Sequence, residues 1–448
     1  MDIDPDPGDL GHAGEGCPRT MMSSVLVLPV PAEAVIDHVH PHGDLIVPLA
    51  VGEPITVLDA LETHADRLQG VKVHQMHAIH DRPYLHGAHG DRLHHISYFL
   101  SPVTRSCFAA GTIDLVPNHF SEVPDLMKLR THDPLVLASA SPPDRHGYFS
   151  LGTNSDYVAS FIGRARFFIE ANAQMPRTFG RNQIHLSQVE GWCHADYPLA
   201  EVPPAEPDEV DQAIGRQVAE RISDGATIQT GIGAIPNAIL ANLANHKDLG
   251  VHTELLSDGL VDLVEAGVVN GVRKTLNRTK VVGTFALGTK RLYDFLADNT
   301  AIELWPVRYV NNPRIIAGEP NFVSINATLA VDFLGQCASE TIGPRYWSSS
   351  GGQSDFARGA MFSPGGQGFI VVRSTARHGE VSSICAQLPI GSAVTTMKNT
   401  VDKVVTEHGV AELRGRSIAE RARALIAVAH PSFRDSLEVQ ARDLGYLH

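Results

Sequence analysis

Two glycines and one glutamate stand out in the stretch "TGIGAIPNAILANLANHKDLGVHTELLSDGL", residues 230–260. Gly231 and Gly233 lie where an apolar strand is expected to turn into a helix, and backbone N–H groups at such a turn can hold an anionic or carbonyl oxygen. The pattern is not a dinucleotide fingerprint, because Pro236 takes the place of its third glycine. Glu254 is expected at the end of the next strand, where a carboxylate can take part in the chemistry of a ligand site. A plain tight turn and a solvated carboxylate are the open alternatives.

A second glycine cluster, "SSSGGQSDFARGAMFSPGGQGF" (348–369), follows in the same half of the chain. Gly351 and Gly352, followed by Gln353, offer backbone donors that no side chain obstructs. A loop whose glycines adopt positive φ fits the pattern too. Two such clusters in one half favour a long ligand that lies between them.

Eleven histidines lie between His38 and His95 and raise the question of a metal site. His74, His77 and His80 fall in "VKVHQMHAIH", which is expected to run from a strand into a loop. A three-residue spacing gives no common ligand face there. The chain contains no HExxH, no CxxC pair and no GxSxG. We therefore predict neither a bound metal nor a serine nucleophile.

The elements that must position these residues alternate between strands and helices. In the first half, short apolar runs bounded by turn residues predict strands, and one helix is expected at 55–68. The predicted strands are "DLIVPLAV" (44–51), "GVKVHQM" (70–76), "PLVLASA" (134–140) and "ARFFIEAN" (165–172).

The second half begins with apolar residues at helical spacing, from Val210 to Ile222, and Gly225 ends that helix. A strand at 226–230, a helix at 236–246 and a strand at 251–255 are expected next, and the C-terminal region is expected to be helical. Pro236 is expected near the first helical position, where its missing N–H costs nothing. This alternation predicts an α/β fold with a mostly parallel sheet. Ligand sites in such folds lie at the carboxyl ends of the strands, where Glu254 falls.

Composition sets the broad class. The 448 residues include 43% apolar and 19% charged residues, with a net charge of −14 and no extended basic run, so nucleic acid is not an expected partner. No apolar run reaches the roughly 20 residues of a membrane helix. Five scattered cysteines suit a reducing, cytoplasmic compartment.

The length predicts more than one domain. We expect an acidic, Gly- and Pro-rich tail and lead-in at 1–34, an N-terminal domain at 35–200 and a C-terminal domain at 201–448. A linker is expected within 196–211, where prolines and acids gather. Met21 or Met22 is an alternative start to Met1.

Several long motifs in order give the chain a resemblance to the acetyl-CoA hydrolase/transferase family, which includes CoA-transferases for 4-hydroxybutyrate, butyrate and succinate. The resemblance runs from about residue 45 to the C-terminus. In the first half the motifs are "AGTIDLVPNHFSEVP", "ASPPDRHGYFSLG" and "EANAQMPRTFG". In the second they are "GIGAIPNAIL", "HTELLSDGLVDLVEAGVVNG", "SINATLAVDFLGQ", "GGQSDFARGA" and "VVTEHGVAELRGRS".

The resemblance implies two related α/β domains of the CoA-transferase type, each with a mostly parallel sheet flanked by helices and with the active site between them. It places the nucleophile at Glu254. Coenzyme A is then a substrate, with no cofactor and no metal, and a homodimer or homotetramer is expected. Many relatives have Gly where this chain has Ser349, so the identity of the acids does not carry over. The residues that the resemblance assigns to CoA are Gly231, Ile232, Gly233, Ala234, Ile235, Gly351 and Gly352, and Gln353 and Asn326 are added as residues that orient a carboxylate or the pantetheine.

The chemistry implied is CoA transfer between an acyl-CoA and a small carboxylic acid through a glutamyl-CoA thioester. The alternative at the same site is hydrolysis of an acyl-CoA such as acetyl-CoA, which follows if water enters the cleft. A ligand-binding module without turnover is a further alternative, and the retained Glu254 argues against it. The last alternative is a metal-dependent hydrolase that uses the histidine-rich N-terminal half.

Overall fold

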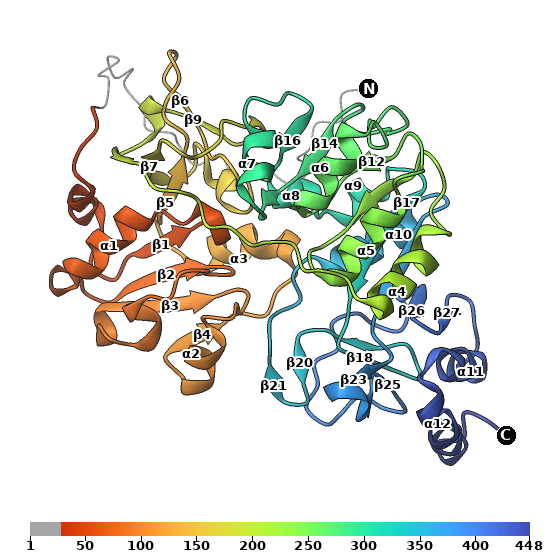
Figure 1. The fold of residues 1–448 in the computed structure, drawn as a ribbon. Coiled ribbons are helices and arrows are strands. Elements are labelled where there is room, and N and C mark those ends of the chain that lie inside the picture. The colour runs from red at the N-terminus through yellow and green to blue at the C-terminus, as the bar shows by residue number, and fades with distance from the viewer. Residues whose placement is uncertain (1–27) are drawn as a thin grey trace, which may run out of the picture.

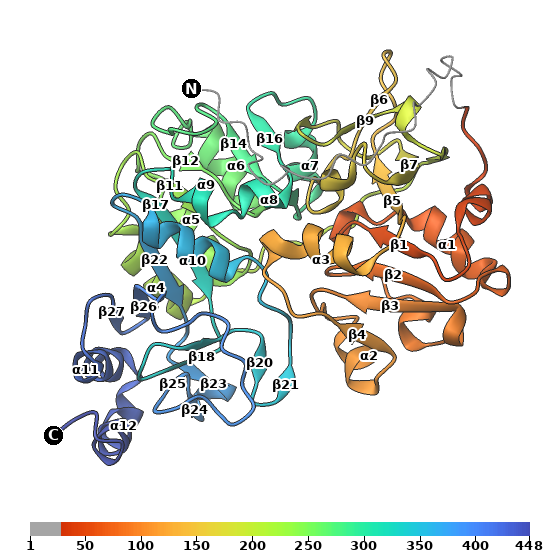
Figure 2. The same cartoon turned by 180° about the vertical axis from the view of Figure 1, so that it is seen from behind.

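The computed structural model describes residues 28–448. Two α/β halves lie side by side, with the first half in red to yellow and the second in green to blue (Figures 1 and 2). Most of the predicted tail at 1–34 lies outside the described residues, as do Cys17 and the alternative start residues Met21 and Met22. Residues 32–34 belong to a 3-10 helix, η1 (Ala32–His38), whose Val35 and Ile36 are buried.

The first half is built on a seven-stranded sheet in which every neighbouring pair is parallel. Helices α1 (Ile55–Thr63), α2 (Arg105–Ala110) and α3 (Val123–Arg130) connect its strands. In spatial order the strands are β10 (Gly191–Ala195), β7 (Arg166–Asn172), β5 (Leu135–Ala140), β1 (Asp44–Val47), β2 (Val71–Gln75), β3 (Leu93–Ser97) and β4 (Ile113–Leu115).

The second half contains a six-stranded sheet, parallel except where β26 meets β27. Its strands, in spatial order, are β12 (Gly250–Val251), β11 (Thr227–Gln229), β17 (Phe322–Ala327), β22 (Gln367–Val371), β26 (Lys403–Thr406) and β27 (Gly409–Glu412). Its longer helices are α4 (Glu209–Ala219), α5 (Ala234–Asn242), α6 (Asp258–Glu265), α7 (Lys290–Leu296), α10 (Gln353–Phe362), α11 (Ile418–Val428) and α12 (Pro431–Asp443). The sheet content therefore confirms the predicted α/β class.

A smaller sheet joins the two halves. Its strands β14 (Val281–Gly283) and β16 (Ile302–Leu304) come from the second half, and β8 (Phe179–Gly180) comes from the first. Strand β18 (Ala330–Asp332) pairs in parallel with β25 (Ile384–Cys385) and antiparallel with β19 (Cys337–Ala338), and this small sheet lies in the lower part of the second half in Figure 1.

One apolar core runs through both halves. It includes Ile46 of β1 and Ile228 of β11, and the Phe120 ring of the first half meets the Phe285 ring of the second edge-on at 6.4 Å. Because burial of apolar side chains is the main stabilising contribution, this shared core holds the halves in a defined relation. Residues 196–208, which contain no helix or strand, run from the first sheet to α4 (Figure 1). The last residues of the predicted linker belong to α4.

Most predicted elements form, with shifted ends. Strands β5 and β7 fall within the predicted ranges, whereas Pro48 follows the end of β1 and the predicted strand 44–51 is shorter. The helix predicted at 55–68 ends at Thr63. Helix α5 covers Ala234–Asn242 rather than the predicted 236–246, so Pro236 is its third residue, in the first turn. Its missing N–H still costs no intrahelical bond, because the first four N–H groups have no partner in the helix.

Helix α4 begins where the sequence signals predict. Asp208 caps it by accepting hydrogen bonds from the N–H groups of Val210 and Asp211, and Ile214 and Val218 are fully buried on one face. Among residues 28–448, no helix is both long and apolar enough to span a membrane.

Candidate active site

Glu254 lies in a bend between two short strands, β12 and β13 (Leu255–Leu256). The single strand predicted over 251–255 is therefore wrong. The chain leaves the six-stranded sheet after β12, because the Thr253 N–H donates to the Val282 carbonyl (2.9 Å) rather than continuing along β11. The carbonyl of Glu254 then accepts from the N–H groups of Thr284 (3.0 Å) and Phe285 (3.2 Å). The backbone that carries the carboxylate is thus held from a neighbouring segment.

Two donors hold the Glu254 carboxylate. Asn311 Nδ2 donates to its Oε2 at 2.7 Å, and the backbone N–H of Gly352 lies near enough to the same group to favour its charged form. Desolvation by the surrounding protein raises the pKa of Glu254 to about 7, the bonds from Asn311 and Gly352 lower it, and the charge of Asp355 raises it. Near neutral pH, a substantial fraction of this carboxylate is ionised and can attack a carbonyl carbon.

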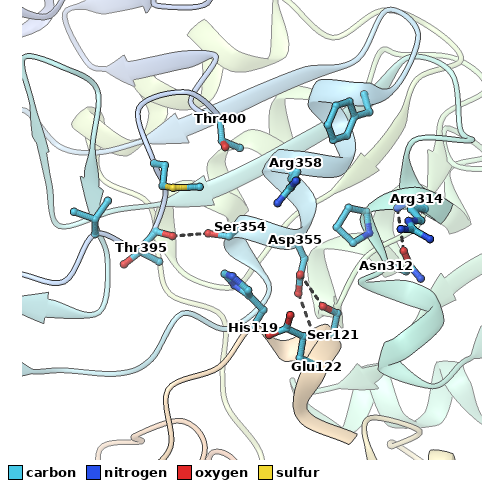
Figure 3. Close-up of a pocket in the computed structure, with 14 residues that line it drawn as sticks. His119, Ser121, Glu122, Asn312, Arg314, Ser354, Asp355, Arg358, Thr395 and Thr400 are labelled. Atoms are coloured by element: carbon cyan, nitrogen blue, oxygen red, sulfur yellow. Dashed lines mark hydrogen bonds between the residues drawn. The ribbon is translucent and has the colours of Figure 1, made fainter. Parts of the chain in front are cut away.

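Contacts between the two halves fix the loop that holds Glu254. The Phe120 N–H donates to the carbonyl of Gly351 at 3.0 Å. Ser121 donates twice to Asp355, from its N–H to Oδ2 at 3.0 Å and from its Oγ to Oδ1 at 2.8 Å (Figure 3). Asp355 lies in the first turn of α10, three residues after Gly352. The first half therefore sets the position of the glycine that donates to the carboxylate.

The pocket of about 490 Å³ drawn in Figure 3 lies beside this contact. Asp355 and Arg358 of α10 line it together with His119 of the first half and Thr395. Glu254 does not line it. This pocket is therefore a neighbour of the candidate site and not the site itself.

Glu254 lines a smaller cavity of about 200 Å³ between the halves. The first half contributes apolar and aromatic side chains to its wall, and the second half contributes the glycine turn after β11. The lining residues are Leu49, Met76, His77, Phe99, Phe120, Gln229, Thr230, Gly231, Ile232, Glu254, Leu255, Phe285, Leu287, Asn326 and Gln353.

The structure brings several predicted residues to this cavity. Gly231, Ile232, Asn326 and Gln353 line it together with Glu254. The Ile232 side chain is 45% exposed, so it offers an apolar surface at the edge of the cavity.

Other predicted residues lie near the cavity without lining it. Gly233, with φ 121°, precedes α5, and Ala234 and Ile235 form the first turn of that helix. Gly351, with φ 56°, and Gly352 lie in the loop before α10, where Gly352 reaches Glu254 through its N–H.

The two predicted amides already have protein partners. Asn326 Nδ2 donates to Gln229 Oε1 at 3.2 Å, and Gln353 Nε2 donates to Thr396 Oγ1 at 3.0 Å. Ser349, the departure from the family pattern, is buried, and its hydroxyl finds no hydrogen-bond partner among residues 28–448.

Three residues that face the site are absent from the predicted set. Asn311 is 57 positions from Glu254 and follows a four-residue helix, α8 (Val307–Val310). The motif "GGQSDFARGA" contains Asp355 but gives it no role at the site. The histidine pattern raises only metal binding for His77. No sequence motif marks Asn311 as a site residue, because its contact with Glu254 forms only in the folded chain.

The histidines that suggested a metal have other partners. His74 lies within 3.1 Å of both Asp44 Oδ1 and Tyr98 Oη, and His80 hydrogen-bonds Glu53. Within residues 28–448, no group of three His, Cys, Asp or Glu side chains is arranged to hold a metal ion.

Two family models match the chain. The acetyl-CoA hydrolase/transferase N-terminal domain matches residues 30–203, and the acetyl-CoA hydrolase/transferase C-terminal domain matches residues 288–441. Glu254 falls between the two matched ranges. The chain belongs to the acetyl-CoA hydrolase/transferase family.

Named relatives cover nearly the whole chain. The 4-hydroxybutyrate coenzyme A transferase of Clostridium kluyveri is 44% identical over 91% of this chain and 96% of its own length. The succinyl-CoA:cyclohexane-1-carboxylate CoA transferase of Geobacter metallireducens is 45% identical over 93% of this chain and 95% of its own. The crystal structure of RipA from Yersinia pestis has a TM-score of 0.89 at 36% identity, over 93% of this chain and 98% of that one. These matches support the fold as well as the family.

Proposed function

We propose that this protein transfers CoA between an acyl-CoA and a small carboxylic acid, with Glu254 as the nucleophile. The observation that carries the proposal is the position of Glu254, which faces a cavity between the halves while Asn311 and Gly352 hold its carboxylate. The relatives' names support CoA transfer as the reaction. A homo-oligomeric state and a cytoplasmic location stay predictions.

The proposed reaction begins with attack of a Glu254 carboxylate oxygen on the thioester carbonyl of the acyl-CoA. The carbon–sulfur bond breaks, which gives an acyl-glutamyl anhydride and the CoA thiolate. The thiolate then attacks the glutamyl carbonyl, and the first acid leaves as a carboxylate. The acceptor acid reverses both steps. Each step exchanges one acyl derivative for another, and the enzyme is covalently modified between the two half-reactions.

The donors around Glu254 suit this sequence. Each tetrahedral intermediate carries an oxyanion, and a well-placed donor stabilises such a charge by roughly 3–4 kcal/mol. Asn311 and the Gly352 N–H already point at the Glu254 oxygens, so they lie where the charge develops when the thiolate attacks the glutamyl carbonyl. We assign Gly231, Ile232 and the turn up to Ile235 to the pantetheine end of CoA, together with Gly351 and Gln353.

Transfer and hydrolysis differ in what the enzyme needs to turn over. With acetyl-CoA and butyrate, we expect butyryl-CoA to form in amounts equal to the acetyl-CoA consumed, because the acid must resolve the glutamyl-CoA thioester. With acetyl-CoA alone, we expect a single turnover and then arrest. Chromatography of CoA esters distinguishes the cases. Continuous release of free CoA without an acid would establish the hydrolase alternative instead.

The pH dependence of transfer should report on Glu254. Because the attacking carboxylate must be ionised and its pKa is raised to about 7, kcat/KM should fall as the pH drops below about 7. Asp355→Asn removes a negative charge that disfavours ionisation of Glu254, so this acid limb should move to lower pH. Ser121→Ala removes a hydrogen bond that lowers the pKa of Asp355, so Asp355 should carry less charge near neutral pH and the acid limb should move in the same direction, but less far. An acid limb that stays in place in Asp355→Asn would contradict the assignment.

A further inference from the structure

The first half contributes an almost entirely uncharged wall to the cavity that Glu254 lines. Apart from Glu254 itself, the only titratable side chain that lines it among residues 28–448 is His77. The other first-half residues on this wall are Leu49, Met76, Phe99 and Phe120. No lysine or arginine of the described chain lines the cavity, so a second negative charge on a bound acid would find no cation there.

His77 does not supply that cation. Its ring packs against Phe99 at 5.5 Å between centroids, and burial lowers its pKa to about 4, so the imidazole is neutral at physiological pH. The charge of Glu53 raises the pKa of His77, though less than burial lowers it, and the Glu53 side chain is itself buried. Its carboxylate accepts hydrogen bonds from Gln75 Nε2 and from the Ile79 N–H, both at 2.8 Å. An anion placed beside His77 would therefore also lie near the acidic side chain of Glu53.

Arg105 is a cation close enough to lower the pKa of His77, but its side chain is bound to other groups. Its Nε donates to the Trp347 carbonyl at 2.6 Å, and its guanidinium lies 3.9 Å above the centre of the Trp347 ring. To pair with a bound acid, it would have to give up both contacts. A buried carboxylate without a partner is costly, so the cavity disfavours a second charge.

We infer that the acids exchanged at this site are compact monocarboxylic acids with an apolar body, and that the wall formed by Leu49, Met76, His77 and Phe99 excludes dicarboxylic acids. The inference rests on the proposed CoA transfer at Glu254. The cavity of about 200 Å³ is smaller than the roughly 300–1,000 Å³ of pockets for drug-sized ligands, which limits the acid to a short or compact body. The neutral His77 ring can still hydrogen-bond an uncharged polar group on that body.

Three acids of similar length test this inference on the full chain with acetyl-CoA as the donor. Pentanoate has an apolar end, succinamate an uncharged amide end and succinate a charged end. We expect pentanoate and succinamate to be accepted, with kcat/KM for succinate at least about 100-fold lower, because a site that cannot pair a charge rejects it strongly. Succinate reacting within threefold of pentanoate would overturn the inference.

A charge placed in the wall gives a second test. His77→Arg should raise the ratio of succinate to pentanoate kcat/KM by about tenfold or more, because an arginine can pair with the distal carboxylate. His40→Arg adds the same charge at an exposed position away from the cavity and should leave the ratio unchanged. An equal rise in both variants would overturn the role of the wall. If no acid accepts CoA and Glu254 carries no adduct, the proposed function itself is wrong, and this inference falls with it.

Discussion

Glu254→Ala should abolish CoA transfer, lowering kcat/KM by about 10,000-fold or more, as removal of a covalent nucleophile does in other enzymes. We expect this loss of activity because the variant has no carboxylate that can accept the acyl group or carry CoA. Native enzyme incubated with acetyl-CoA and no acid should accumulate a glutamyl-CoA thioester. Borohydride reduces that thioester to an alcohol, so peptide mass spectrometry locates the modified residue.

Two further variants separate chemistry from shape at this position. Glu254→Gln keeps the length of the side chain and an oxygen for Asn311, but an amide is a poor nucleophile, so the adduct should be absent. Glu254→Asp keeps the carboxylate and withdraws it by one methylene, so transfer should be strongly slowed because near-attack placement is lost. Native transfer by the alanine variant, or an adduct on another carboxylate, would refute the assignment.

The sequence carries enough local information to predict the sheets that position Glu254. Apolar runs such as "PLVLASA" and "ARFFIEAN" are buried on both faces in β5 and β7, so their hydrophobicity alone indicates parallel strands. The break at Glu254 was not predictable in this way. Residues 251–255 contain no Gly or Pro that would signal a break, and the chain divides because the Thr253 N–H finds a hydrogen-bond partner in β14.

Residues that act on Glu254 from far along the chain could not be predicted either. Asn311 and Asp355 have no motif that marks them as neighbours of Glu254, and their approach depends on how α8 and α10 pack. His77 illustrates the opposite case. A dense set of histidines raises the question of a metal, but the His77 ring packs against Phe99 and lines the cavity instead. Composition reports which side chains exist, and packing decides which of them meet.

Gly352→Ala should reduce kcat by about 100-fold or more, because a displacement of about 1 Å at a reacting group has an effect of that size. A Cβ at this position would lie 1.9 Å from Glu254 Oε2 and 2.3 Å from Asn311 Nδ2, so both side chains would have to move. The backbone itself accepts alanine, since Gly352 has φ −95°. The fold should therefore survive, and thermal unfolding should show a Tm close to that of the native protein.

Gly231→Ala is the matched control for this variant. A Cβ at Gly231 would have no protein atom within 4 Å, and its φ is not positive, so neither the fold nor Glu254 should be disturbed. If CoA occupies that space, KM for the acyl-CoA should rise while kcat changes little. Gly233 is a poorer choice, because its φ of 121° strains any side chain whatever the space. A native kcat in Gly352→Ala would mean that Glu254 is not held at this glycine during the reaction, and its assignment as an oriented nucleophile would then have to be abandoned.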